Sequence, residues 1–349
     1  MRTFVMKGIG SVGFMDKPIP DCGPLDAIVK TTAALICTSD SHTVRGAIGP
    51  RNNLTLGHEA VGVVYKVGAM VRLFRPGDRV VVGAITPDWG SLAAQQGAPP
   101  QSNQALGGWK FSNIKDGVFA EYFHVNEADA NLAKIPDGVA DDAAVYVADM
   151  LSTGLAGAEG ANIPMGGTVA VFAQGPVGLM ATVGARLQGA SYIIAVESVP
   201  ARQALARQYG ADEVVDYTKV DVIDRILDLT NGEGVDSAIE ALGSDTTFQQ
   251  AIEVTKPGGC ISNIGYHGEG EFVHIPRMAW GAGMAQKTIR TVLSPGGRLR
   301  LSRLLALVEG GRVDPTLMTT HRFPFRRADE AFRIMDGKLD GVLKPLIEF

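Results

Sequence analysis

The chain has 349 residues and a formal net charge of −5, with 32 Lys and Arg against 37 Asp and Glu. This length exceeds the roughly 250–300 residues at which a single hydrophobic core stops growing, so we expect two domains. The mild acidity argues against a nucleic-acid-binding protein, and three cysteines are too few for a disulfide framework. No uncharged apolar run approaches the roughly 20 residues that span a bilayer, and the first eight residues lack a signal-peptide core, so we expect a cytoplasmic protein.

The first 150 residues predict mixed β structure. Short runs rich in β-branched residues occur at 27–30, 60–64 and 79–82, the last after a turn-like Arg-Pro-Gly-Asp segment. Residues 86–117 show no clear period and contain several prolines and glycines, which indicates a long loop-rich lobe. A loop of this length in a compact domain is usually functional.

The middle of the chain changes to strands that alternate with helices of about ten residues. Strands are expected at 168–173, 192–196, 213–216, 235–239 and 260–264, and helices at 177–187, 200–209, 222–230 and 246–254. This alternation predicts an α/β fold with a doubly wound parallel sheet and helices on both faces. It stops near Leu293, and the remainder predicts helices at 299–308 and 328–335 and a closing strand at 342–347. We therefore expect a cofactor domain (152–294) inserted into a β-rich catalytic domain (1–151 and 295–349).

A dinucleotide-binding turn is predicted between the first strand and helix of the inserted domain. Residues 173–178 have the spacing of G-x-G-x-x-G with Ala173 in first position, so that Gly175 would let the backbone approach a pyrophosphate and Gly178 would let the helix pack on the strand. Pro176 and Val177 begin that helix. Glu197 lies 19 residues after Gly178, where a carboxylate commonly binds the adenosine ribose. The alternative is an ordinary glycine-containing turn before a packed helix.

Glu197 also favours NAD over NADP, because a carboxylate repels the 2′-phosphate of NADP. Ser198 and the two residues after it supply no cation, whereas Arg202 could reach the site. Three further candidates follow later strands of the domain: Tyr217 for the adenine end, and Asn263 and Tyr266 for the nicotinamide.

A metal site is indicated by a cysteine and a histidine in separate segments of the catalytic domain. Cys37 begins the run Cys-Thr-Ser-Asp-Ser-His, which ends at His42, and His58 lies in the block 57–62. That block, with Gly68 and Val71, fits G-H-E-x2-G-x5-G-x2-V at every fixed position. Each residue alone is more commonly a small buried thiol or an ordinary polar histidine, but the complete block favours a zinc site.

These segments together resemble the zinc-dependent medium-chain alcohol dehydrogenases, and among them the bacterial tetrameric secondary-alcohol dehydrogenases. The similarity extends over the whole chain and is carried further by the segments 86–89, 108–113, 116–119, 121–126 and 294–299. It implies a Rossmann domain inserted into a GroES-like catalytic domain, and a homotetramer.

The resemblance implies one catalytic zinc held by Cys37, His58 and Asp149, with Glu59 as a fourth ligand that water or substrate displaces. Asp149 stands where many members of the family have a cysteine. Asp40 is a candidate acceptor for the His58 ring, or alternatively a helix-cap aspartate. The lobe at 86–117 has no cysteine, so we expect no second, structural zinc.

By the same resemblance, the reaction is reversible hydride transfer between a small secondary alcohol or ketone and NAD. Ser39 would accept the hydroxyl proton, which passes through the cofactor ribose to His42 and then to solvent. Ser39, Ala84, Trp109 and Leu293 would line the substrate site, with Met284 reaching from a neighbouring subunit. The alternatives are a simple turn hydroxyl for Ser39, a surface histidine for His42, and plain packing for the pocket residues.

Two other functions fit these observations. A zinc dehydrogenase of a polyol, a threonine-like amino-alcohol or a primary alcohol would have the same fold and zinc site. A non-catalytic cofactor-binding relative would be expected to lack Cys37, His58 or the relay residues, all of which are present. No nucleic-acid or membrane partner is expected.

Overall fold

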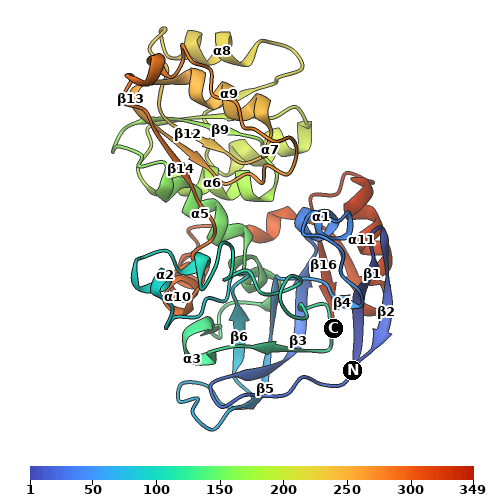
Figure 1. Cartoon of the computed structure of the whole chain (residues 1–349). Helices are drawn as coiled ribbons and strands as arrows, with labels where there is room; N and C mark the ends of the chain where they lie inside the picture. Colours follow the sequence, from blue (N-terminus) through green and yellow to red (C-terminus); the bar gives the residue numbers. More distant parts are fainter. The chain divides into compact units, whose positions relative to one another are not determined.

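The computed structural model describes all residues from 1 to 349, and the chain forms two compact units. Unit 1 comprises Met1–Ser152 and Ser294–Phe349, and unit 2 comprises Thr153–Leu293 (Figure 1). No helix is long and apolar enough to cross a membrane.

Unit 1 is built on a sheet in the order β15-β16-β3-β5-β6-β8, with β7 also pairing with β3. The strands are β3 (Ala27–Leu35), β5 (Ala60–Val67), β6 (Arg79–Val82), β7 (Tyr122–Val125), β8 (Leu132–Lys134), β15 (Thr319–Pro324) and β16 (Lys344–Glu348). A second sheet has the order β2-β1-β4, from Ser11–Asp16, Arg2–Gly8 and Leu54–Thr55. The hydrophobic core of unit 1 contains a set of buried phenylalanines, among them Phe4, Phe111, Phe119 and Phe123.

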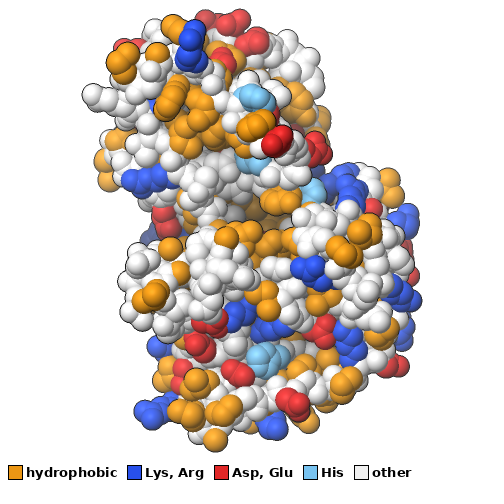
Figure 2. Space-filling view, in the orientation of Figure 1, with side chains coloured by type: hydrophobic (Ala, Val, Ile, Leu, Met, Phe, Trp, Pro, Cys, Tyr) orange, Lys and Arg blue, Asp and Glu red, His pale blue; other side chains and the backbone are white.

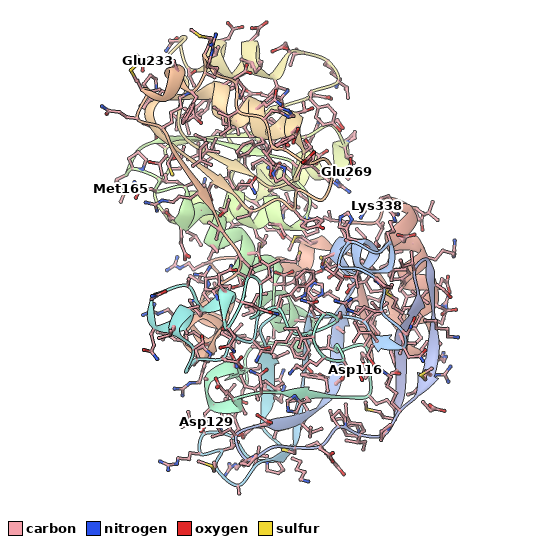
Figure 3. The ribbon with its side chains drawn as sticks, viewed as in Figure 1. Asp116, Asp129, Met165, Glu233, Glu269 and Lys338 are labelled. Atoms are coloured by element: carbon pink, nitrogen blue, oxygen red, sulfur yellow. The ribbon has the colours of Figure 1, made fainter.

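The last strand of the chain is an interior strand of this sheet. β16 runs antiparallel to β3, with Leu346 opposite Leu35 and Ile347 opposite Ala34, and it is parallel to β15 on its other side. Helix α11 (Ala328–Gly337) precedes β16. Lys338 at the C-terminus of α11, labelled in Figure 3, donates a 2.7 Å hydrogen bond to Thr38 of helix α1 (Thr38–Val44). The closing segment therefore packs against helix α1 and strand β3, which lie in the first quarter of the chain.

Unit 2 contains a parallel six-stranded sheet in the order β11-β10-β9-β12-β13-β14. Its strands are β9 (Thr168–Phe172), β10 (Tyr192–Val196), β11 (Glu213–Val215), β12 (Val235–Glu240), β13 (Thr255–Asn263) and β14 (Thr288–Thr291). The helices between them are α6 (Pro176–Leu187), α7 (Pro200–Gln208), α8 (Val222–Leu229) and α9 (Asp245–Val254). The strand order reverses between β9 and β12, which is the point where such sheets bind ligands at the carboxyl ends of their strands.

The lobe expected at 86–117 contains only the short helix α2 (Leu92–Gln95) and a 3₁₀ turn at Pro99–Gln101. Polar side chains tie it together. Asp88 accepts hydrogen bonds from Lys110 and Asn103, and Asn126 donates to the carbonyl oxygens of Thr86 and Pro87. At the far end, Asp116, labelled in Figure 3, pairs with Lys17 at 2.7 Å.

Two strands of unit 2 differ from the predicted pattern. β14 extends the parallel sheet beyond the predicted last strand, and β13 begins at Thr255, five residues before the predicted start. β14 has the sequence Thr-Ile-Arg-Thr and is mostly exposed, so it carries none of the apolar continuity that identifies a buried strand. Its pairing with β13 is a tertiary contact that hydrophobic periodicity does not encode.

Candidate zinc site and dinucleotide site

Four potential metal ligands converge in unit 1 from three separate segments. Cys37, His58, Glu59 and Asp149 each offer a ligand atom, and all four atoms lie within 4.8 Å of one another. We call these four residues the donor cluster. His58 and Glu59 are buried and the other two are half-buried.

Local backbone structure places each ligand. Cys37 is the N-cap of α1, and the Asp40 carboxylate closes the cap by accepting a 2.9 Å hydrogen bond from the Cys37 backbone N–H. Gly57 precedes His58 with a φ of +88°, where a Cβ atom would collide with the Phe119 ring. Asp149 directly precedes helix α5 (Met150–Gly160).

The two nitrogens of His58 have different surroundings. Nδ1 lies 3.3 Å from Oδ1 of the buried Asp40, so the Asp40 carboxylate both caps the helix and orients this ring. Nε2 lies 3.5 Å from Asp149 Oδ2 and 3.8 Å from Glu59 Oε1. An imidazole whose Nδ1–H faces a carboxylate presents Nε2 as the ligand atom, which is the usual arrangement at zinc.

The charges in the donor cluster favour a bound cation. Burial disfavours the charged imidazole, but Asp40 and Asp149 outweigh it and hold the pKa of His58 well above its usual range. Burial likewise raises the pKa of Glu59 to about 7, against the opposing effect of Lys344. Oε2 of Glu59 is buried and has no hydrogen-bond partner, although buried carboxylate oxygens are normally satisfied.

A thiolate, an imidazole nitrogen and carboxylate oxygens are the ligands that zinc accepts, and three of them leave a position for substrate. A metal ion bound at the donor cluster would give Oε2 of Glu59 the partner that it lacks. The donor cluster therefore fits a catalytic zinc.

The predicted dinucleotide turn lies at the carboxyl end of β9. Ala173 adopts a φ of +68°, Gly175 is the N-cap of α6, and Pro176 and Val177 are its first residues. A Cβ atom at Gly178 would collide with the Ala173 carbonyl oxygen, so the close approach requires glycine. The turn thus has the backbone form of the fingerprint although its first residue is alanine.

We expect the change Ala173→Gly to stabilise the protein by about 1 kcal/mol, because glycine adopts a positive φ without the steric cost that alanine bears. The unfolding midpoint in urea should rise. The control Ala170→Gly, in the buried interior of β9, should lower it. A lower midpoint for Ala173→Gly would contradict the strain at this turn.

Glu197 follows β10 and is buried against this turn. Its Oε2 accepts a hydrogen bond of 3.1 Å from the Gln174 N–H, and its Oε1 accepts from the N–H groups of Ser198 and Val199. Arg202 lies on the same carboxylate, with Nη1 3.8 Å from Oε2. Arg202, the cation that could have met a 2′-phosphate, therefore faces the Glu197 carboxylate.

The other predicted cofactor residues have mixed placements. Asn263 ends β13, donates to the Gly265 carbonyl oxygen, and its Oδ1 lies 2.9 Å from His267 Nε2. Tyr266 is half exposed in the loop that follows. Tyr217 is exposed after β11.

Family comparisons match both units. Residues 23–137 match the alcohol dehydrogenase GroES-like domain, and residues 176–309 match the zinc-binding dehydrogenase domain. The NADP-dependent isopropanol dehydrogenase of Thermoanaerobacter brockii is 51% identical over 99% of both chains, and that of Clostridium beijerinckii is 49% identical over the same share. The solved alcohol dehydrogenase TADH from Thermus sp. ATN1 has a TM-score of 0.91 at 30% identity and covers 100% of this chain and 99% of its own.

The chain belongs to the zinc-dependent alcohol dehydrogenases. The predicted fold, a Rossmann sheet with a β-rich GroES-like part, is confirmed. The predicted preference for NAD is not confirmed, because both isopropanol dehydrogenases named above are NADP-dependent.

The predicted relay residues of this alcohol dehydrogenase lie in helix α1, whereas the other predicted substrate residues are spread over three separate segments. Ser39 Oγ is 3.2 Å from His58 Nε2 and so faces the donor cluster, and His42 is half-buried in the same helix. The Ala84 N–H donates to the Ala148 carbonyl oxygen, which puts Ala84 next to the ligand segment. Trp109 is half-buried within the lobe, and Leu293 is the half-buried last residue of unit 2.

Two buried residues of the alcohol dehydrogenase are absent from the predicted set. Lys344 contacts Glu59, and the Gln174 side chain bonds to Val171 and Thr182 beneath the dinucleotide turn. Gln174 lies inside the fingerprint and could have been noticed there. Lys344 has no local sequence feature that marks it.

Proposed function

We propose that this alcohol dehydrogenase interconverts small secondary alcohols and ketones by hydride transfer with NAD(H), using one zinc held by Cys37, His58 and Asp149. The convergence of these ligands with the Ser39 hydroxyl is the observation that carries the proposal. Unit 1 would serve as the catalytic domain and unit 2 as the dinucleotide-binding domain. Zinc would supply Lewis acidity, which lowers the pKa of an alcohol hydroxyl.

Side chains of helix α1 would carry the hydroxyl proton of the substrate toward solvent. Ser39 is close enough to the donor cluster to accept the hydroxyl proton of a substrate there, and Asp40 keeps the His58 ring oriented. His42 would exchange the proton with solvent, since an imidazole titrates near neutral pH.

Preference for secondary alcohols is supported by the similarity to the two isopropanol dehydrogenases and by the apolar character of the predicted substrate residues Ala84, Trp109 and Leu293. A substrate panel tests it. With zinc-loaded protein, kcat/KM should be higher for 2-propanol and 2-butanol than for ethanol, sorbitol or threonine. A higher value for ethanol, sorbitol or threonine would instead support the polyol, amino-alcohol or primary-alcohol alternative.

Glu197 supports NAD as the cofactor. Its buried carboxylate follows β10, where the adenosine ribose binds in this class of sheet, and an anion there opposes a 2′-phosphate. The two isopropanol dehydrogenases named above are NADP-dependent, so this chain would differ from them in the cofactor it prefers.

A homotetramer is the proposed assembly. Figure 2 shows hydrophobic side chains at the surface of both units. In unit 2, the segment between β13 and β14 exposes apolar side chains that include Phe272, Met278 and Met284, and β14 is an edge strand of the sheet. Light scattering on a sizing column should give about four times the 36.8 kDa chain mass. A monomer would contradict the assembly.

Replacing His42 with Gln is expected to lower kcat by roughly tenfold or more and to shift its pH dependence upward. Without an imidazole, proton release depends on solvent, which accepts protons readily only at higher pH. Steady-state profiles from pH 6 to 10 measure both effects, with the exposed His274→Gln as a control. An unchanged pH profile would count against the relay.

A further inference from the structure

Lys344 is a fully buried lysine at the start of β16, next to the donor cluster. Its Nζ lies 2.6 Å from Glu59 Oε1, and both side chains have no exposed surface. The other oxygen of the same carboxylate, Oε2, has no hydrogen-bond partner. Glu59 is thus held through one oxygen while the second is left available.

A buried ammonium is costly to desolvate, so its charge must be matched nearby. Burial works against the charged form of Lys344, yet Cys37, Glu59 and Asp149 together hold its pKa above the usual range. Zinc (+2), the three anionic ligands (−3) and the neighbouring Asp40 (−1) would leave two excess negative charges around a neutral His58, and Lys344 (+1) offsets one of them. Asp40 also accepts hydrogen bonds from the N–H groups of Cys37 and Gly57.

Lys344 is the lysine paired with Glu59, so without it the metal would be the main compensating charge for this carboxylate. If Lys344 no longer held Oε1, the Glu59 carboxylate would turn toward zinc and occupy the position that substrate needs. The ion pair prevents this because it binds one oxygen firmly, through a charge-assisted contact between two fully buried side chains.

We propose that Lys344 is a positioning residue that holds Glu59 by Oε1, so that Oε2 can bind and leave zinc during turnover without becoming a permanent ligand. The proposal rests on the zinc site described above. It gives this lysine, which lies 285 residues from Glu59 in sequence, control over exchange at the metal.

Two substitutions should move zinc exchange in opposite directions. In Lys344→Met the unpaired Glu59 should remain on the metal, so zinc transfer to a chromogenic chelator should slow by roughly tenfold or more. In Lys344→Arg the guanidinium can bind both carboxylate oxygens, which withdraws Glu59 and should speed the transfer by a similar factor. A purely structural role predicts faster loss in the methionine variant and no change in the arginine variant.

The cobalt-substituted proteins give an independent readout. The d–d absorption should indicate an added oxygen ligand in Lys344→Met and its loss in Lys344→Arg, relative to the parent protein. Lys134→Met, which removes an exposed lysine paired with Asp78, is the matched control and should change neither measurement.

Faster or unchanged zinc transfer in the methionine variant would overturn the proposal, as would unchanged or slower transfer in the arginine variant. Either variant alone is decisive if the other does not fold. A parent protein that binds no zinc would instead refute the zinc site itself, so the two failures are distinguishable.

Discussion

Replacing Cys37 with Ala should lower the zinc content from one ion per chain to nearly none and reduce kcat/KM for 2-propanol by about a thousandfold or more. Cys37 provides the only sulfur among the four donors, and thiolate is a strong ligand for zinc. The Lewis acid contributes several kcal/mol to the transition state, and each 1.36 kcal/mol corresponds to a factor of ten.

Metal analysis and steady-state kinetics on the same preparation test this expectation. The other two cysteines provide matched controls, because Cys22 and Cys260 lie outside the donor cluster. Their alanine variants should keep both zinc and activity. A Cys37→Ala protein that retains one zinc and most of its activity would show that the catalytic metal lies elsewhere.

The parent protein is expected to have a higher kcat/KM with NAD than with NADP, and the double change Glu197→Gly with Val199→Arg should reverse that order. Removing the carboxylate eliminates the repulsion of a 2′-phosphate, and the arginine adds a charge-assisted contact worth about 1.5–3 kcal/mol. The ratio of kcat/KM for NADP to that for NAD should rise by about a hundredfold.

The control for this pair is Glu233→Gln, which neutralises an exposed carboxylate of unit 2 in the turn after α8, labelled in Figure 3. It should leave the ratio unchanged. A parent enzyme that already prefers NADP would refute the NAD proposal while leaving the zinc site and the secondary-alcohol proposal untouched.

Much of the architecture could be predicted from local patterns. The alternating strands and helices between Thr168 and Val254 identify the Rossmann sheet, because each element carries its own apolar run and its own turn residues. The short polar strand β14 has no such run and was not predicted. The sequence is compatible with Asp40 as a helix cap or as a partner of His58, and in the structure Asp40 makes both contacts.

The sequence by itself predicted the dinucleotide turn from residue type and short spacing, and it predicted Cys37 and His58 as metal donors from their motif. Glu59 and Asp149 were added as donors by the resemblance to a family. Only the tertiary structure decided how the donors meet and what lies behind them. Glu59 and Lys344 are brought together because β16 returns to pair with β3 in the interior of the catalytic sheet. Such a pairing depends on the closure of the whole sheet, and it places a fully buried ion pair beside the proposed zinc site.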